Sequence, residues 1–466
     1  MKTTHAGVKI VLYSETGDVE TMRKLFMLGC ISCLMIFAVS SCAANTEQSE
    51  SNIAYGRVVK TDEKTITVED GDYSYGEDFK GSGKEISYNL PESVFFDDFK
   101  KGDIVAILFD GKDATAVTNV EYVENGKKAD EDTEGKNALV KADNEEKSVS
   151  DEDYSSSEDD TVGILALNSD GRFDISRISV RMDGEDSAGI GSQAGGHAEG
   201  NQISISMTGD GSSPLRTYDE NSVIDITDGN IETSGENSPC LYSSGNISIS
   251  GVTAVSRNSS AVMVGKGGVV NIKDSNVTSY SGPAVDISSE SAGSSDASTA
   301  KMMVSSSSLR SEDDEALVRV SGAEAYVRFI KSTISCGSGV LADITGDDNE
   351  NGGKLLMYGV GQTFNGSINC DLNSKVKLVL SEGSRLTGAV NPGDSAYYSK
   401  VYISDDSEWE LTADSYTSSI VNELEDCSNI ESNGHNIYYD SENLANEWLA
   451  GRTISLKGGG VLAPAE

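Results

Sequence analysis

The sequence predicts an all-β protein in which a small β-barrel-like domain precedes a long parallel β-solenoid. The main observation is a ladder of short β-branched segments, Ile203–Ile205, Ile224–Ile226, Ile247–Ile249 and Val270–Ile272, whose last residues follow at intervals of 21, 23 and 23 residues. A repeat of this length cannot bury its own apolar face and must stack on its neighbours. The composition agrees, since 48 glycines against 6 prolines favour many turns and aromatic residues make up only 6% of the chain.

A second strand recurs between these segments. Cys240, Ala261 and Ala284 occupy one repeat position, again 21 and 23 residues apart, and each is followed by a short apolar run. Each coil therefore has at least two strands joined by polar turns, which is typical of a parallel β-helix with coils stacked about 4.8 Å apart. A leucine-rich repeat has a similar period, but its leucine spacing is missing. We expect the helix to span residues 161–440, about a dozen coils at this period.

The N-terminus has the pattern of a secretion signal. Arg23 and Lys24 precede an apolar run, Leu25–Val39, which is too short to cross a bilayer comfortably. The segment Val39–Cys42 resembles the bacterial lipobox, in which the chain is cut before the cysteine and its sulfur is lipidated. The resemblance implies that Cys42 carries the anchor of an exported bacterial lipoprotein. An ordinary signal peptide that ends at Ala43-Ala44 is the alternative.

We therefore expect residues 1–41 to be an upstream extension and signal peptide, and residues 42–51 to be a tether. Met22 is the expected start of translation, and a cytoplasmic tail from Met1 is the alternative. Lipidation would hold the protein on the outer face of a bacterial membrane or at the cell surface, because acyl chains bind a bilayer by burying their methylenes.

Residues 52–124 contain five short strand candidates separated by polar turns. This spacing predicts a small barrel. Lys100–Asp103, which leads into an apolar run, resembles a turn of small OB-like barrels. Because basic and stacking residues are not concentrated in this region, we expect a spacer or protein-binding module and no nucleic-acid site.

Residues 125–160 are expected to form an acidic, disordered linker. Between Lys127 and Asp160 the chain holds 13 acidic and 5 basic residues with almost no apolar periodicity. Calcium condensation on these carboxylates is the functional alternative. The formal net charge of the whole chain, −40, excludes nucleic acid and anionic membrane surfaces as partners, and disfavours polyanionic polymers unless divalent cations bridge them.

Residues 161–440 resemble bacterial right-handed parallel β-helix surface proteins of the pectate-lyase-like and adhesin or autotransporter-passenger type. The segment Ser407–Thr412 is similar to an S-x-W-x-L-T element near the end of adhesin-like helices. The resemblance implies a surface scaffold, with residues 441–466 as a C-terminal cap or tail. That tail is too short for an autotransporter barrel, so we expect export to rest on the lipobox.

One loop has the start of a calcium motif. Asp347, Asn349 and Asn351 match the alternating oxygen ligands of a D-x-[DN]-x-[DN]-G loop, and they are the candidate metal ligands. The twelfth position is Tyr358 and not glutamate, so an acidic surface loop is the alternative. Since the chain has only three histidines, of which His197 begins an H-x-E pattern, a histidine metal site or a Ser-His-Asp triad is not expected.

No catalytic residue is assigned from the sequence. Asp225 and Lys273 could approach similar positions two coils apart, but their alternation with apolar residues is that of any outward strand face. We expect a non-catalytic, adhesin-like or structural scaffold that binds carbohydrate or another surface protein, without a cofactor other than calcium. The alternatives are a polysaccharide lyase or glycoside hydrolase and a calcium-dependent binding module. Whether Cys240, Cys336, Cys370 and Cys427 form disulfides stays open.

Overall fold

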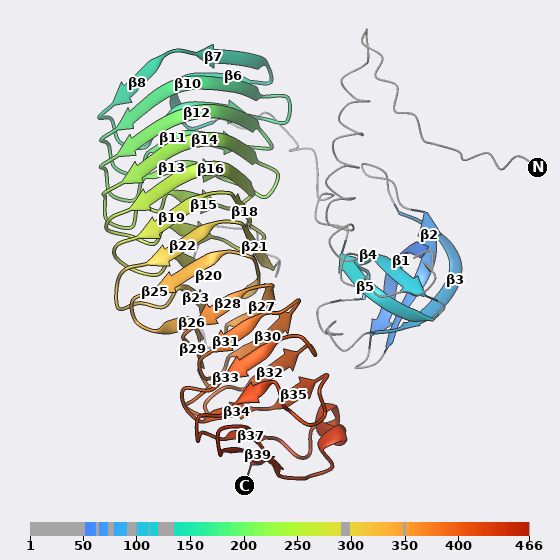
Figure 1. The fold of residues 1–466 in the computed structure, drawn as a ribbon. Coiled ribbons are helices and arrows are strands. Elements are labelled where there is room, and N and C mark those ends of the chain that lie inside the picture. The colour runs from blue at the N-terminus through green and yellow to red at the C-terminus, as the bar shows by residue number, and fades with distance from the viewer. Residues whose placement is uncertain are drawn as a thin grey trace, which may run out of the picture. The chain divides into compact units, whose positions relative to one another are not determined.

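The computed structural model describes residues 52–61, 65–72, 79–90, 99, 101–110, 112–119, 135–289, 299–347 and 351–465. They form two compact units, a barrel unit that ends at Asn119 and a solenoid unit after it (Figure 1). Both units are built almost entirely from strands, which confirms the predicted all-β class. Over these ranges no helix is both long enough and apolar enough to span a membrane.

The barrel unit closes five strands in the order β1-β2-β3-β5-β4, with β1 antiparallel to both β2 and β4. Its core is apolar and includes Val58, Ile66, Val105 and Ile107. The small barrel predicted from the sequence is therefore present. The strands are β1 (Asn52–Thr61), β2 (Thr65–Asp72), β3 (Lys80–Asn89), β4 (Ile104–Asp110) and β5 (Asp113–Asn119).

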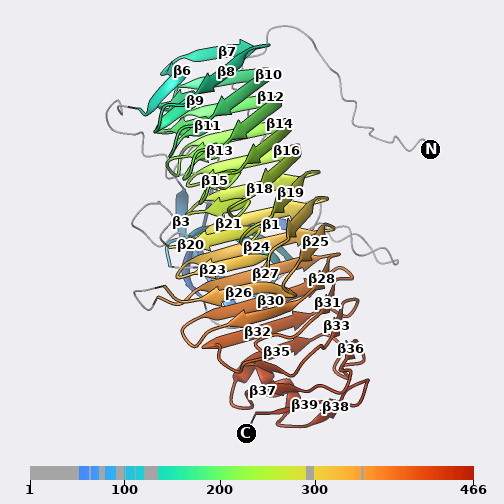
Figure 2. The same cartoon turned by 90° about the vertical axis from the view of Figure 1, so that its left-hand side faces the viewer.

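The solenoid unit consists of about 13 turns, and its strands stack in parallel sheets along one axis (Figure 2). We call the largest of these the large sheet. Its strands are β7 (Glu146–Ser150), β8 (Asp153–Ser156), β10 (Arg172–Met182), β12 (His197–Met207), β14 (Val223–Thr233), β16 (Asn246–Ser256), β18 (Val269–Lys273), β19 (Asn276–Ser279), β21 (Ala300–Ser305), β22 (Ser308–Ser311), β24 (Glu324–Ile330), β25 (Thr333–Cys336), β27 (Lys354–Val360), β30 (Lys375–Ser381), β32 (Tyr398–Ile403) and β35 (Ser419–Asn422).

The second sheet faces the large sheet across one continuous apolar core of Ile, Val, Leu and Ala. Its strands are β6 (Asn137–Asp143), β9 (Thr161–Leu167), β11 (Ala188–Gln193), β13 (Ser213–Thr217), β15 (Leu241–Ser243), β17 (Val262–Val264), β20 (Val285–Ser288), β23 (Val318–Ser321), β26 (Val340–Thr345) and β29 (Ser367–Cys370). Cys240, Ala261 and Ala284 are fully buried beside this sheet at one register position, as predicted.

Two small sheets complete the C-terminal coils. One contains β28 (Thr363–Asn365), β31 (Arg385–Thr387), β33 (Glu408–Glu410) and β36 (Ile430–Glu431). The other contains β34 (Ser415–Thr417), β37 (Ile437–Tyr439), β39 (Val461–Pro464) and β38 (Ile454–Ser455). A short 3-10 helix, η3 (Leu444–Leu449), and the antiparallel pairing of β38 with β39 end the solenoid, so paired strands continue beyond the expected limit at residue 440.

One rung of the predicted ladder is wrong in register. Ile205 pairs with Ile231 and not with Ile226, which lies opposite Gly200. The reason is that β12 has a glycine at the position where β10, β14, β16 and β18 have isoleucine. A Cβ at Gly200 would lie 2.7 Å from the Ile226 side chain. The Ile203–Ile205 segment belongs to the second half of its strand, so the first coils are longer than the spacing of the ladder suggests.

The predicted limits of the disordered linker are also wrong. Strands β6, β7 and β8 lie within it and form the first coil, since β6 pairs with β9, and β7 and β8 pair with β10. Most of their charged residues occupy turns and outward positions, as exposed Glu146 does in β7. Lys147 is the exception in this strand, since it is half-buried opposite Phe173 and forms an ion pair with Glu145 (2.6 Å). The acidic composition of this segment therefore reflects an exposed strand face and does not prevent strand formation.

Buried serines satisfy backbone amides at the bends between strands. The amide of Val252 donates to Ser275 Oγ (3.0 Å), the amide of Ser275 to Ser307 Oγ (3.1 Å), and the amide of Ser307 to Ser332 Oγ (3.3 Å). The residues before these serines, which are Asp274, Ser306 and Lys331, have positive φ values. This conformation turns the chain, so the backbone amide of each serine is not opposite a strand carbonyl. Because an unpaired buried amide is costly, each coil supplies a hydroxyl to the one before it. We call this row the serine ladder.

Glycine is required where successive turns approach most closely. A Cβ on Gly184 would lie 2.2 Å from Glu158 O, one on Gly209 would lie 1.9 Å from Gly184 O, and one on Gly235 would lie 2.1 Å from Gly209 O. These glycines recur once in each of three successive turns, so their spacing in the sequence marks the true period of the first coils.

Candidate functional site

Two of the predicted site residues lie outside the described residues. These are Cys42, the predicted lipidation site, and Asn349 of the predicted calcium loop. Asp347 and Asn351 are close together. The backbone amide of Asn351 donates to Asp347 Oδ1 (2.9 Å), and its side-chain Nδ2 donates to Asp347 Oδ2 (3.0 Å). Ser289 Oγ donates to the same Oδ2 (2.9 Å). Both oxygens of this carboxylate therefore accept hydrogen bonds within the protein.

Other polar groups singled out from the sequence also have protein partners. Asp225 Oδ2 lies 3.0 Å from His197 Nε2, on the outward side of the large sheet. Lys273 is opposite Ser250, whereas Asp225 is opposite Ser248, so the two residues are not in one column. Across the described ranges, no group of three or more His, Cys, Asp or Glu side chains is arranged to hold a metal ion.

The four cysteines considered for disulfides are free thiols. Cys240 is fully buried, and burial raises the pKa of its thiol well above the ordinary range. Burial raises the pKa of Cys370 to about 12. Thiols with raised pKa values are poor nucleophiles, since the thiolate is the reactive form.

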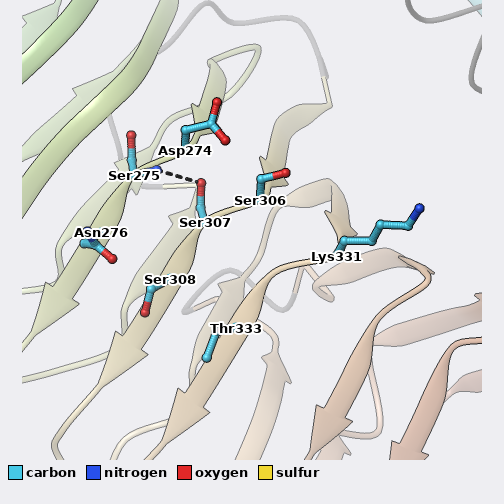
Figure 3. A pocket seen from close by; sticks show the side chains of 8 residues that line it. All are labelled: Asp274, Ser275, Asn276, Ser306, Ser307, Ser308, Lys331 and Thr333. Carbon is cyan, nitrogen blue, oxygen red and sulfur yellow. Dashed lines mark hydrogen bonds between the residues drawn. The ribbon is translucent and has the colours of Figure 1, made fainter.

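An open hollow of about 520 Å³ lies over the serine ladder and is lined by Ser275, Ser307 and Lys331 among others (Figure 3). The backbone amide of Ser275 donates to Ser307 Oγ, and this hydrogen bond joins two of the lining residues (Figure 3). Because the buried hydroxyls here already pair with backbone groups, we interpret this hollow as a by-product of the ladder.

A second hollow, of about 300 Å³, lies on the outward side of the second sheet. Asp343 of β26 and Asn369 of β29 project there from neighbouring coils, at paired register positions. Asp371, which follows β29, and Ser395 complete the polar lining. We call this hollow the acidic groove.

The two carboxylates of the acidic groove have opposite pKa shifts. Partial burial, with repulsion from Glu315, raises the pKa of Asp343. Burial also opposes ionisation of Asp371, but hydrogen bonds outweigh it and hold the pKa of Asp371 below its ordinary value. The donors include the amides of Gly346 (2.7 Å) and Asn373 (3.1 Å). The groove therefore pairs a carboxyl that resists ionisation with one that ionises readily.

A pair of stacked tyrosines lies next along the same side. Tyr416 of β34 and Tyr438 of β37 are opposite each other on adjacent coils, with ring centroids 5.0 Å apart and planes 22° apart. Asn436 Nδ2 donates to the Tyr438 hydroxyl (3.1 Å), which fixes the outer end of this ring. Both rings are partly exposed. We call this pair the tyrosine platform.

The segment 391–395 connects the platform with the acidic groove. Asn391 Nδ2 donates to Tyr416 O (3.3 Å), and Asn391 Oδ1 accepts from the amide of Ser395 (3.0 Å), a residue of the groove lining. Burial raises the pKa of Tyr416, and the nearby carboxylates of Asp414 and Asp394 raise it further. The groove and platform together present carboxylate and amide groups beside a flat aromatic surface.

The sequence contains the signals for this site, but they lie at outward positions and not on the apolar rungs. Tyr416 and Tyr438 are separated by one coil of the chain, and so are Asp343 and Asn369, which gives both pairs the repeat spacing. Searching the outward positions for residues at this spacing would have identified them. The tryptophan of the resembled S-x-W-x-L-T element is structural, since Trp409 is fully buried and its Nε1 donates to Gly388 O (3.0 Å).

Comparison with known proteins does not assign this chain, because no family model, no curated protein and no solved structure matches it.

Proposed function

We propose that the solenoid is a non-catalytic, adhesin-like scaffold that binds carbohydrate at the acidic groove and tyrosine platform. The observation that carries this proposal is the stacked pair Tyr416 and Tyr438 on an outward face beside a polar groove. Concave sites that combine ring surfaces with a few convergent polar groups are suited to small ligands. Carrying these groups on strands of a rigid stack keeps them in fixed positions.

The chemistry favours a neutral sugar. A pyranose ring has an apolar C–H face that packs on an aromatic ring, and its hydroxyls donate to carboxylates such as Asp371 and Asp394. The formal net charge of −40 opposes an acidic glycan at a site whose own side chains are acidic. Another surface protein is the alternative ligand.

Export and lipidation belong to the same proposal. The lipobox-like segment that ends at Cys42 supports a lipid anchor on the outer face of a bacterial membrane, where a glycan-binding scaffold would meet its ligand. Labelled palmitate should enter the wild-type protein and not Cys42→Ala. Equal labelling of both proteins would contradict the anchor.

A second candidate function, hydrolysis of a glycan, is favoured by the opposite pKa shifts of Asp343 and Asp371. Glycosidases use one protonated and one ionised carboxyl group, and environments that separate two pKa values support such roles. In this reading Asp343 is the general acid. The backbone hydrogen bonds that Asp371 accepts also stabilise the turn after β29, and this structural role accounts for them without catalysis.

A glycan array tests both functions. The labelled full chain should bind neutral glycans, and the double variant Tyr416→Ala/Tyr438→Ala should lose the signal. Tyr280→Ala is the matched control, because Tyr280 is a half-exposed tyrosine elsewhere on the solenoid. Absence of binding to any glycan, or equal loss in the control, would contradict the proposal. Release of new reducing ends from a bound glycan, abolished by Asp343→Asn, would establish hydrolysis instead.

A further inference from the structure

Arg216 lies on the outward face of the second sheet without a carboxylate partner. It alternates in β13 with the buried residues Leu215 and Thr217, so its own side chain is on the solvent side. Other arginines of the solenoid pair with acidic groups, as Arg177 does with Asp151 (2.7 Å). Within the described ranges, the Arg216 guanidinium makes no hydrogen bond and no ion pair. Such a cation is unexpected in a chain with 76 acidic and 36 basic residues.

Two tyrosine rings lie against this guanidinium. The Cζ atom of Arg216 is 5.1 Å from the ring centroid of Tyr218 and 4.6 Å from that of Tyr242. Tyr242 is opposite Arg216 on the following coil. The Tyr218 ring extends over the preceding coil, where Gly191 is opposite Arg216 and a Cβ on this glycine would lie 3.2 Å from Tyr218 Cε2. Each neighbouring coil therefore contributes space or a ring to hold the cation by its π-electrons.

The Tyr218 ring has a fixed position. It packs against a small apolar cluster that includes Val162 and Leu165 on the outward side of β9. A second cation, Lys136 Nζ, lies 5.9 Å from its centroid, but this ammonium group is paired with Asp160 (2.5 Å). The charge of Lys136 is therefore balanced within the protein, and that of Arg216 is not.

Asp219, the carboxylate nearest to Arg216 along the chain, is engaged in the turn after β13. Its Oδ2 accepts hydrogen bonds from Ser222 Oγ (2.9 Å) and from the backbone amide of Ala194, and its Oδ1 accepts from the amide of Asn221 (3.2 Å). Both oxygens of this carboxylate are thus used to close the turn. The in-plane N–H groups of Arg216 have no acceptor from the described residues and are suited to one from outside the chain.

The outward positions that follow Arg216 are apolar or aromatic. Tyr242 is next along the stack and Met263 of β17 follows it, and both are half-buried. At about 4.8 Å per coil, the three positions span about 10 Å. An arginine fork binds a carboxylate through two parallel hydrogen bonds, and a tyrosine ring beside a thioether offers an adaptable surface to a flat apolar group. The net charge of −40 opposes anions of high charge, which favours a monoanion.

We propose that Arg216 binds the carboxylate of a small organic acid whose flat apolar part lies over Tyr242 and Met263. This site is separate from the acidic groove. Five coil intervals, or about 24 Å, lie between Arg216 and Asp343 in the same outward column. The proposal therefore goes beyond carbohydrate binding and does not depend on it.

Hippurate, which joins a benzoyl group to a carboxylate, is the probe for the full chain. Saturation-transfer NMR should show saturable binding with a Kd of about 1 mM, a typical affinity for a ligand of this size. Hippurate methyl ester has no charge for Arg216 to pair with, so it should bind the wild type at least about tenfold more weakly. Acetate has the charge but no ring, so it should not displace hippurate at equal concentration.

Arg216→Gln should weaken hippurate binding at least about tenfold. Arg257→Gln is the matched control, because Arg257 also lies over a tyrosine ring, that of Tyr280 (5.7 Å), but is paired with Glu232 (2.5 Å). This control should bind hippurate as the wild type does. The proposal would be overturned by a wild type without saturable binding, by equal affinities for hippurate and its ester, or by equal losses in the two variants. Displacement of hippurate by equal acetate would overturn the role of the apolar surface.

Discussion

Arg319 forms a two-pronged ion pair with Asp286, the residue directly opposite it on the preceding coil. Its Nη2 lies 2.6 Å from Asp286 Oδ2, and its Nε lies 3.3 Å from Oδ1. On the following coil Arg319 is opposite Asp343, a residue of the acidic groove. Because the guanidinium fork is oriented toward Asp286, its attraction lowers the pKa of Asp343 less than burial and acidic neighbours raise it.

The raised pKa of Asp343 makes stability depend on pH. A carboxyl whose pKa is higher in the folded state binds its proton more tightly there, so its contribution is full below the unfolded value of about 3.9 and is lost as pH rises through the folded pKa. Asp343→Asn, which mimics the protonated form, should therefore raise Tm at pH 7 and leave it unchanged at pH 3. Calorimetry of both proteins checks this. A lower Tm for the variant at pH 7 would be inconsistent with the shift.

The serine ladder predicts a stability loss at a residue far from the groove. Ser307→Ala removes the acceptor of the Ser275 amide, which then remains buried without that partner. We expect the free energy of unfolding to fall by about 1–3 kcal/mol. Ser308→Ala, a change of a partly exposed serine on the same turn, is the control. Equal effects of the two substitutions in urea unfolding would argue against the ladder.

Close contact between turns predicts a larger loss at Gly209. A Cβ there would lie 1.9 Å from Gly184 O, and this backbone atom moves only if the turn shifts. Gly209→Ala should cost about 3 kcal/mol, since overpacked sites must distort their surroundings. Gly393→Ala should be tolerated, because its Cβ would meet only Ser395 Oγ at 3.3 Å. The thermal midpoints of the two variants provide the comparison.

Calcium should have little effect on the Asp347 loop. Both oxygens of Asp347 accept hydrogen bonds from Asn351 or Ser289, and these bonds would have to break before the oxygens could coordinate the ion. We therefore expect about 5 mM CaCl2, which exceeds the Kd of about 1 mM of the weakest extracellular calcium modules, to leave Tm unchanged. A rise in Tm that Asp347→Ala abolishes would instead establish a calcium site.

The sequence predicted the architecture because buried positions repeat with the period of the coil. Cys240, Ala261 and Ala284 align as expected, since strands of equal spacing must stack in register. The prediction was wrong in the coil of β12. Gly200 has no side chain there, so the apolar pattern indicates Ile205 as the rung residue, although Gly200 is the residue that pairs with Ile226. It was also wrong over β6 to β8, because charges on an exposed strand face resemble those of a linker.

The site was harder to predict than the fold for a physical reason. Core positions all need the same apolar chemistry, so their repetition is visible along the whole chain. Outward positions vary freely along the chain. Asp343 and Tyr416 can be recognised as parts of a site only when their partners on the next coil, Asn369 and Tyr438, are known.

The most direct test of carbohydrate binding is calorimetric titration of the full chain with the glycan that gives the strongest array signal. Tyr416→Phe keeps the ring and should bind within about threefold of the wild type, whereas Tyr416→Ala removes the ring and should weaken binding at least about tenfold, or about 1.4 kcal/mol. Equal affinity of Tyr416→Ala and the wild type would contradict binding at the tyrosine platform.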